Sequence, residues 1–381
     1  MALHVFPYMH RPVPYTMRAK VQPRKQFCTL SNTRGVDAPV SERRIPSLDG
    51  VRAISITLVI LSHLVKWKHI SLEVLGSYGS LGVFVFFVLS GYLITNLLLR
   101  EHERTSSISL RMFYLRRAFR IFPAAFVFLA VVIVLYWHQM QWTHIAAAVF
   151  YVANMDLSRP WIFGHLWSLS IEEQFYLLWP FALKKWYRHR TGILLCAFWA
   201  TPAFQTALYA LKVHNGLIGS LPIYSSQLAI GCLLAILAPR IPRITRPIAL
   251  AMFAVFVFVP WFPATNRART LFDLFVLSPA LHISVAGLVL HVIQTPYRFL
   301  NWAPVAWLGR ISYSLYLWQE LFCSNAAMHA GYVLVVPSIA CACLSYYLVE
   351  QPMLRLRDNW TRKPSQARPV LAPAENIPLA G

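Results

Sequence analysis

Charged residues are scarce in this sequence. Asp, Glu, Lys and Arg together make up 13% of the 381 residues, whereas 57% are hydrophobic and 14% are aromatic. A soluble domain usually contains about 25% charged residues. The composition therefore excludes an ordinary soluble globular protein and predicts a polytopic membrane protein.

Acidic residues are the rarer of the two charged classes. The chain has 14 Asp and Glu against 35 Lys and Arg, which gives a formal net charge of +21. Spread over a soluble surface, this excess would favour nucleic-acid binding, but the basic residues cluster between apolar runs. Such clusters are typical of cytoplasmic loops of membrane proteins and of contacts with anionic lipids. We therefore expect membrane lipids, and no nucleic acid, among the partners.

The six cysteines lack the spacing of a zinc ribbon or of a secreted disulfide framework. Most lie inside apolar runs. Cys341 and Cys343 are two residues apart, so their side chains diverge on a helix. We interpret the cysteines as small buried hydrophobic residues and expect no metal site.

The first 44 residues lack the apolar core of a signal peptide and contain eight Lys and Arg. We expect residues 1–44 to form a basic, disordered cytoplasmic arm. Residues 358–381, rich in Pro and Ala, should form a disordered cytoplasmic tail. The membrane domain is then residues 45–357, in which we find no internal repeat and no long hydrophilic insert.

Apolar runs long enough to cross about 30 Å of hydrocarbon set the fold class. There are about ten, which predicts an all-α protein with about ten transmembrane helices, near 48–66, 78–99, 121–138, 163–183, 191–211, 217–238, 247–263, 271–293, 310–329 and 331–350. The run at 144–155 is too short to cross easily. We interpret it as re-entrant or interfacial, with an eleventh span as the alternative.

With ten spans, the main basic stretches fall on one side of the membrane. These are the arm before residue 45, 100–120, 184–190, 239–247 and 355–363. The positive-inside rule makes this side cytoplasmic and places both termini there. Weaker basic pairs at 66 and 68 and at 267 and 269 lie on the other side.

Arg52 and His63 lie eleven residues apart in the first apolar run. At about 100° per residue the two side chains return to within roughly 20° of each other, about 16 Å apart along the helix. Intramembrane ionisable residues are costly and therefore indicate function. Arginine binds phosphate and imidazole exchanges protons near neutral pH, so the pair fits an elongated anionic ligand. The alternative is an anchoring arginine and a hydrogen-bonded interfacial histidine.

A cluster of arginines precedes the third apolar run. Arg116, Arg117 and Arg120 lie within about one helical turn where the chain enters the membrane. Together with the positive end of a helix, such a cluster suits phosphate or pyrophosphate. The alternative is a basic run that sets orientation or contacts lipid headgroups.

Two adjacent carboxylates, Glu172 and Glu173, lie within the apolar run 163–183. One helical face carries His165, Ser168, Glu172, Tyr176 and Trp179, and Glu173 points about 100° away. A carboxylate of this pair can orient His63 or bind a hydroxyl acceptor. The alternative is a polar clamp between helices.

Further polar residues occur near the C-terminal end. Ser312, Tyr313 and Tyr316 can hydrogen-bond within the core, which we favour, or contact substrate. Glu350 before Pro352 should anchor the last span. The string SGYLI at 90–94 provides small residues at which helices can approach closely.

Six strings, taken in order, closely resemble the membrane acyltransferase 3 family of bacterial O-acyltransferases. They are PSLDGVRAISITLVILSH, GVFVFFVLSGYLIT, FYLRRAFRIFPA, HLWSLSIEEQFYLLWP, LGRISYSLYLWQE and YYLVEQPMLR, and they span residues 45 to 357. The resemblance implies a multi-pass enzyme of the bacterial inner (cytoplasmic) membrane. Such an enzyme moves an acyl group, commonly acetyl, from acyl-CoA to a hydroxyl of a polysaccharide, lipopolysaccharide or lipid-linked sugar.

The resemblance also implies roles for individual residues. Arg52 and His63 match the family motif of a basic residue, ten intervening residues and a histidine, and Arg117 and Arg120 match its R-x-x-R signature. The arginines, with Arg116, then bind the phosphates of acetyl-CoA or another acyl-CoA, the donor substrate, and no permanently bound cofactor is implied. His63 is the expected general base. Glu172, or else Glu173, would orient it or bind the acceptor, with Ser168, Tyr176, Ser312 and Tyr313 as further substrate-binding candidates.

The sequence departs from the family pattern at two places. Gln319 stands where the family often has histidine, and YSSQLAIG at 224–231 lacks a frequent arginine and acid. The first departure argues against proton transfer at Gln319, and the second suggests an altered donor or acceptor pocket. We also expect any second transfer step to need a partner or not to occur, because we find no esterase-like domain of the kind fused to some relatives.

Two other functional classes compete with an O-acyltransferase. A membrane transporter of a glycan or acyl intermediate would also have polar groups within the membrane. Broken helices and inverted repeats would favour a transporter, and we detect neither in the sequence. A membrane sensor or scaffold would leave His63 and Glu172 without a role.

Overall fold

The computed structural model describes residues 46–65, 73–211, 225–261, 271–323 and 335–361, all within the unit Glu42–Gly381. The predicted arm 1–44 and the end of the predicted tail lie outside these residues. The described part contains helices and turns and no strand, so the all-α class is confirmed.

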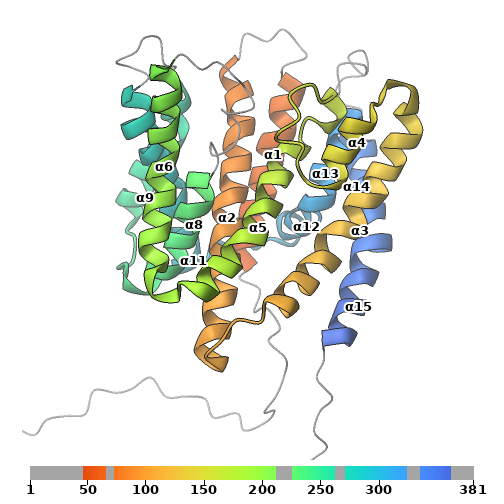
Figure 1. Cartoon of the computed structure of the whole chain (residues 1–381). Coiled ribbons are helices and arrows are strands. Elements are labelled where there is room, and N and C mark those ends of the chain that lie inside the picture. Colours follow the sequence, from red (N-terminus) through yellow and green to blue (C-terminus); the bar gives the residue numbers. More distant parts are fainter. Residues whose placement is uncertain (1–45, 66–72, 212–224, 262–270, 324–334, 362–381) are drawn as a thin grey trace, which may run out of the picture. The chain divides into compact units, whose positions relative to one another are not determined.

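A helix occupies each of the ten predicted apolar runs. Figure 1 shows α1 (Pro46–Val65), α2 (Glu73–Thr105), α3 (Leu110–Tyr136), α4 (Trp142–Val149), α5 (Leu166–Lys185), α6 (Arg190–Ala210), α8 (Ser225–Leu237), α9 (Arg246–Phe258), α11 (Ser278–Gln294), α12 (Ala303–Arg310), α13 (Ser312–Phe322), α14 (Val335–Ser345) and α15 (Gln351–Thr361). Single π-helical turns, Asp273–Leu277 and Tyr346–Glu350, precede α11 and follow α14. The run near 144–155 forms the eight-residue helix α4, which is too short to cross hydrocarbon. α15 continues to Thr361, past the expected start of the tail at residue 358.

Four described helical segments are long and apolar enough to cross a membrane. They are Gly79–Thr105, Leu110–Gln139, Tyr187–Leu208 and Asp273–Gln294, and the shorter apolar helices are Ser226–Arg240 and Arg246–Phe258. The predicted count of about ten is therefore not confirmed. α5 has 20 residues but carries two glutamates and a glutamine in its middle. The predicted spans at 217–238 and 310–329 extend into residues outside the described ranges.

Helices α1, α2 and α8 pack in sequence across the middle of the bundle. α2 contacts both α1 and α8, α6 packs on α8, and α1 packs on α12. α13 packs on α14, and α3 on α15. α1 therefore has α2 on one side and α12 and α13 on the other, and its polar residues can face helices from both halves of the chain.

Small residues bring α2 and α8 into backbone contact. A Cβ atom added to Gly231 would lie 3.0 Å from Cα of Val88, and one added to Gly91 would collide with the backbone of Leu228 and Cys232. The predicted close approach at SGYLI is thus confirmed, with α8 as the neighbouring helix. This contact fixes the position of α2, which separates two polar regions described below.

Exposed basic residues gather at one end of the bundle, the lower end in Figure 1. There α2 ends, α3 begins, α5 turns into α6, and α15 ends. The exposed members in the described part include Arg104, Lys184, Lys185, Arg188, Arg240, Arg243, Arg246 and Arg355. We call this the basic end. The N-terminus of α1, with Arg52, lies toward it, and His63 lies toward the opposite end.

Candidate active site

The arginine predicted on α1 lies beside those predicted on α3. Arg52 forms an ion pair with Asp49, one turn earlier, at 3.3 Å. It also interacts electrostatically with Arg117 and Arg120. Three guanidinium groups from two helices are thus close enough to influence one another electrostatically near the basic end, and we call Arg52, Arg117 and Arg120 the arginine cluster.

Glu172 of α5 belongs to this end of the site. Arg117 Nη2 lies 3.6 Å from Glu172 Oε1, and the Arg117 guanidinium stacks over the Tyr176 ring at 3.8 Å. The hydroxyl groups of Tyr176 and of Ser90 on α2 both donate hydrogen bonds to Glu172. Arg117 of α3 is therefore held by two side chains of α5, one of which is in turn hydrogen-bonded to α2, and its charge is partly balanced by one carboxylate.

Glu173 and Arg116 differ from their neighbours in their surroundings. Glu173 Oε1 is buried and has no hydrogen-bond partner within the described ranges, although the carboxylate interacts electrostatically with Arg117 and Tyr151. Arg116 is partly exposed at the start of α3. The structure thus brings Arg117, and not Arg116, into contact with Glu172.

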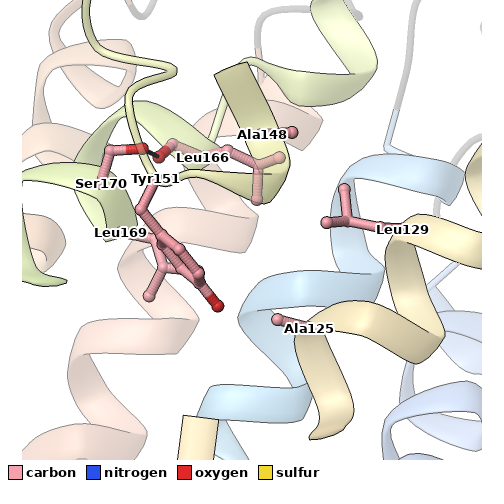
Figure 2. Close-up of a pocket in the computed structure, with 7 residues that line it drawn as sticks. All are labelled: Ala125, Leu129, Ala148, Tyr151, Leu166, Leu169 and Ser170. Atoms are coloured by element: carbon pink, nitrogen blue, oxygen red, sulfur yellow. Dashed lines mark hydrogen bonds between the residues drawn. The ribbon is translucent and has the colours of Figure 1, made fainter. Parts of the chain in front are cut away.

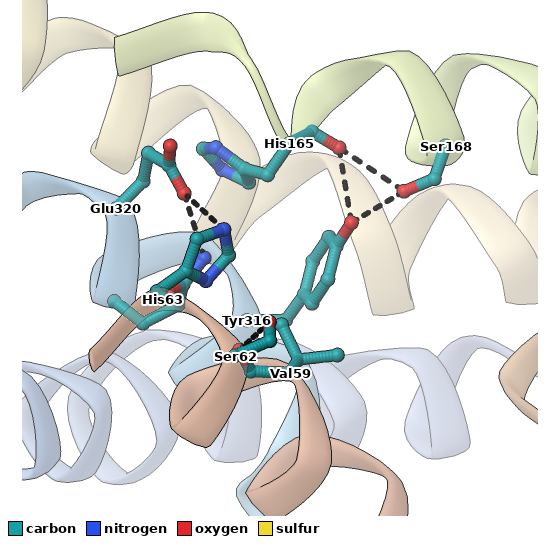
Figure 3. Close-up of polar contacts among 8 residues, drawn as sticks. Val59, Ser62, His63, His165, Ser168, Tyr316 and Glu320 are labelled. Carbon is teal, nitrogen blue, oxygen red and sulfur yellow. Dashed lines mark hydrogen bonds and ion pairs between the residues drawn. The ribbon is translucent and has the colours of Figure 1, made fainter. Parts of the chain in front are cut away.

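His63 faces a carboxylate that the sequence analysis did not select. Its Nε2 lies 3.8 Å from Oε2 of Glu320 on α13 (Figure 3), and the Glu320 side chain is 11% exposed. The neighbouring Gln319 amide donates a hydrogen bond of 2.9 Å to the same oxygen. We call His63, His165, Tyr316 and Glu320 the histidine cluster. Glu172, which was expected to orient His63 or bind the acceptor, instead contacts Arg117.

His165 and Tyr316 complete the histidine cluster. In Figure 3 the buried His165 ring points toward Glu320 and His63, and it lies edge-on to the Tyr316 ring with centroids 5.5 Å apart. The Tyr316 hydroxyl donates to the His165 carbonyl at 3.1 Å and lies 2.5 Å from the Ser168 hydroxyl. The Ser168 hydroxyl thus fixes the position of the Tyr316 hydroxyl. Side chains from α13 and from the start of α5 lie beside His63 (Figure 3).

The remaining substrate-binding candidates lie in packed positions. The Tyr313 hydroxyl donates to the Ile121 carbonyl at 2.8 Å, which fits the hydrogen-bonding role that we favoured. Ser312 is buried at the start of α13. Tyr176 contacts the arginine cluster and Ser168 the histidine cluster, although both lie on one face of α5.

Sequence reasoning missed three residues of the histidine cluster as candidates. Glu320 is an acid within an apolar run, the same signal that selected Glu172, and His165 stands directly before α5. Tyr316 was weighed together with Ser312 and Tyr313, with packing favoured over substrate contact, and was not selected as a site residue. These three residues come from α13 and from the turn before α5, and pairing them with α1 required knowledge of the tertiary contacts.

A small internal cavity lies between α3, α4 and α5. It measures about 10 Å³ and is lined mainly by apolar side chains with Tyr151 and Ser170 (Figure 2). This volume holds at most about one water molecule. The cavity is therefore too small for a substrate. Within the described ranges, no group of three or more His, Cys, Asp or Glu is arranged to hold a metal ion.

Comparison with known proteins adds a family assignment. A family model described as an acyltransferase domain, Acyl_transf_3, matches residues 45–349. Among curated proteins, the peptidoglycan O-acetyltransferase OatA of Listeria monocytogenes is 31% identical over 323 residues, which covers 73% of this chain and 49% of OatA. A putative O-acetyltransferase of Staphylococcus aureus is 31% identical over 80% of this chain and 54% of its own length.

A third relative gives the same result. The putative peptidoglycan O-acetyltransferase YrhL of Bacillus subtilis is 30% identical over 82% of this chain and 55% of YrhL. The chain thus spans about half the length of the curated relatives that it matches. No solved structure matches.

Proposed function

The chain belongs to the acyltransferase 3 family, and from this premise we propose that it is a membrane O-acyltransferase that moves an acyl group, first of all acetyl, from acyl-CoA to a glycan hydroxyl. The observation that carries the proposal is that α1 contributes one residue to each of two separate groups of polar side chains. Arg52 joins the arginine cluster near the basic end, and His63 joins the histidine cluster farther along the same helix.

The arginine cluster fits the phosphates of a coenzyme A thioester. Guanidinium groups bind phosphate oxygens through paired hydrogen bonds. These guanidinium groups therefore suit an anionic acyl carrier that enters from the basic end. We propose that the basic end faces the cytoplasm of a bacterium, where acyl-CoA is found, and that the protein resides in the cytoplasmic membrane.

The histidine cluster fits proton transfer during acyl transfer. His63 takes the proton of the acceptor hydroxyl as its oxygen attacks the thioester carbonyl carbon. A carbon–oxygen bond forms, the carbon–sulfur bond breaks, and the thiolate of coenzyme A leaves and takes up a proton. The Glu320 carboxylate, 3.8 Å from Nε2, stabilises the positive charge that the imidazole acquires between these steps.

The acceptor that we propose to test first is peptidoglycan. OatA is named as a peptidoglycan O-acetyltransferase and YrhL as a putative one. Lipopolysaccharide, other polysaccharides and lipid-linked glycans are the further acceptors to test. All of them present sugar hydroxyls, which is the group that the proposed chemistry requires.

The central test is His63→Ala in membranes supplied with radiolabelled acetyl-CoA and peptidoglycan fragments. We expect the transfer of label to fall at least ~100-fold, because a general base typically contributes this much. His138→Ala, at an exposed histidine beyond the end of α3, is the control and should keep full activity. Undiminished transfer by His63→Ala would exclude the proposed base, and movement of glycan without covalent transfer would indicate a transporter.

The donor site is tested by replacing Arg117 and Arg120 together with alanine. We expect the acyl-CoA concentration that gives half-maximal rate to rise, because two phosphate-binding groups are lost. A fall in the maximal rate with an unchanged requirement for acyl-CoA would contradict the donor assignment. Protein abundance in the membrane should be measured in parallel, since Arg117 also contacts Glu172.

A further inference from the structure

A second and larger cavity lies on the other side of α2 from His63. It measures about 160 Å³ and lies between α2, α6, α8 and α11. Phe84 of α2 lines it, whereas Phe86, about 200° farther round the helix, contacts Tyr316 of the histidine cluster. The cavity is therefore separate from the histidine cluster and has no role in the chemistry proposed above.

The polar lining of this cavity has no permanent charge within the described ranges. None of the described lining residues is Asp, Glu, Lys or Arg, and the polar ones are Thr201, Gln205, Ser226, Gln227, Ser278 and His282. None of these side chains provides a lysine or arginine partner for a phosphate or carboxylate. Hydroxyl and amide groups both donate and accept hydrogen bonds, so the lining suits a neutral ligand with many hydroxyl groups.

A chain of hydrogen bonds orients the amide in the wall. The Ser226 hydroxyl donates to Gln227 Oε1 at 3.3 Å, so the Gln227 amide nitrogen points toward His282, whose Nε2 lies 2.9 Å away. All three side chains are buried. Groups held in this way are pre-organised, and a ligand would bind without having to order them first.

Two aromatic rings complete the wall. Phe84 and Phe198 both lie edge-on to the His282 ring, with centroid distances of 5.8 and 6.2 Å. Binding sites for small molecules commonly combine apolar surfaces with a few fixed polar groups. The aromatic rings offer apolar surface to the C–H groups of a sugar, and the amide and hydroxyl groups bind its hydroxyls.

The cavity lies in the half of the bundle away from the basic end. Thr201 and Gln205 lie toward the end of α6, and Ser226 and Ser278 lie in the first turns of α8 and α11. α6 begins, and α8 and α11 end, at the basic end. The cavity is thus in the same half of the bundle as His63, where a glycan acceptor is used.

We propose that the cavity between α2, α6, α8 and α11 binds a neutral saccharide unit, as a second contact for the glycan acceptor. Its recognition of an acceptor rests on the proposed function, whereas saccharide binding as such does not. Its volume exceeds that of the small cavity near Tyr151 about 16-fold by the two values, 160 and 10 Å³, and is sufficient for many water-sized groups.

The test is direct binding of tri-N-acetylglucosamine to the full chain in lipid nanodiscs, without glycoside detergents that would compete. Saturable binding by calorimetry is expected for the wild type. His282→Phe and Gln227→Leu, which preserve volume on two different helices, should each weaken binding about tenfold or more, since each leaves buried polar groups unpaired. Ser226→Ala should weaken binding less, because this substitution removes only the hydrogen bond that orients the Gln227 amide.

His291→Phe is the matched control. His291 is a buried histidine on the same helix, and its ring nitrogens contact the Ile244 carbonyl and the Tyr297 hydroxyl instead of the cavity. This variant should bind the saccharide like the wild type. Comparison of free chitobiose with polyprenyl-linked chitobiose shows whether the ligand comes from a soluble or a lipid-linked glycan, and binding of either one supports the proposal.

The outcomes separate this proposal from the proposed function. The saccharide site is overturned if the wild type binds no saccharide, if His282→Phe and Gln227→Leu bind as well as the wild type, or if the cavity retains only lipid. If acetyl transfer proceeds normally in those cases, the proposed function stands alone. Conversely, saccharide binding that depends on Gln227 and His282, without any transfer by the wild type, leaves the site standing and removes the enzyme.

Discussion

Two glutamates in apolar helices have opposite partners in this protein. Glu172 pairs with an arginine and two hydroxyls near the basic end, and Glu320 lies beside an imidazole in the other half. The Glu172 carboxylate offsets the permanent positive charge of Arg117. A carboxylate beside an imidazole, such as that of Glu320 beside His63, stabilises the protonated form of the ring. The two residues therefore affect different steps of the proposed reaction.

The first residue-scale prediction concerns Glu320→Gln. We expect the maximal rate of acyl transfer to fall by roughly tenfold or more, because the charge on protonated His63 loses its stabilising partner. The requirement for acyl-CoA should be unchanged, and the pH dependence of the rate should shift, an effect that a purely structural change would not produce. Glu103→Gln, at an exposed position near the end of α2, is the control. A rate and pH profile equal to those of the wild type would remove Glu320 from the reaction.

The second residue-scale prediction concerns Asp156, between α4 and α5. Burial acts to raise the pKa of Asp156, but hydrogen bonds with His144, at 2.6 Å, and with Ser158 outweigh it and lower this pKa. A lowered pKa stabilises the fold above the unfolded value, about 3.9, and this stability is lost as pH falls through the folded value.

Asp156→Asn should therefore speed hydrogen exchange across 150–165 at pH 7. The difference from the wild type should vanish at a pH well below about 3.9, where the wild-type carboxyl is also protonated. Asp358→Asn, at an exposed ion pair on α15, should leave this segment unchanged. A difference that persists undiminished in acid would show that the charge of Asp156 is not what holds the segment.

The residues of the arginine cluster could be selected from the sequence, and their partners could not. Arg52, Arg117 and Arg120 stood out because cations are costly near hydrocarbon. Spacing along one helix says nothing about which other helix faces it. For this reason Glu320, the carboxylate beside His63, was not selected from the sequence, and the expectation that Glu172 or Glu173 orients His63 or binds the acceptor stays a prediction.

At the scale of helices, the crossing of α2 and α8 determines where the two polar regions lie. Gly91 and Gly231 allow the backbones to touch, so that one face of α2 meets the histidine cluster and another lines the second cavity. Loss of this contact should affect the whole bundle.

The element-scale prediction is that Gly91→Ala and Gly231→Ala each lower the stability by about 1–3 kcal/mol, because an added methyl group forces the backbones apart. Gly192→Ala is the control, since nothing lies within 4 Å of an added Cβ at this helical position. It should be neutral or stabilising by about 0.5–1 kcal/mol. Thermal unfolding in one detergent compares the three, and equal stability of all of them would contradict a tight crossing.

The positions of the helices could be read from apolar runs, because hydrocarbon selects for them directly. Helices are present in all ten runs. The number that cross the membrane could not be obtained in the same way. Helices such as α5 carry carboxylates that reduce their apolar character, and length and composition then no longer separate spanning from buried helices.

For the molecule as a whole, the uneven distribution of charge predicts the orientation. Exposed basic residues gather where α5 meets α6, and the segment around Ser158 lies at the opposite end. Alkaline phosphatase fused after Ser158 should be active, and the same enzyme fused after Arg188 should be inactive, because it folds only outside the cytoplasm. Green fluorescent protein at the two positions should give the reverse pattern. Active phosphatase after Arg188 would reverse the proposed orientation.

Helix α1 carries one member of each cluster, Arg52 and His63, on a single rigid rod. The distance and the relative direction of the two side chains are therefore set by the number of residues between them. Inserting one residue between them would lengthen the rod by only about 1.5 Å but turn His63 by about 100° away from Glu320. Under the proposed function, such an insertion should therefore separate donor binding at Arg52 from proton transfer at His63, although the change in length is one that the bilayer would tolerate.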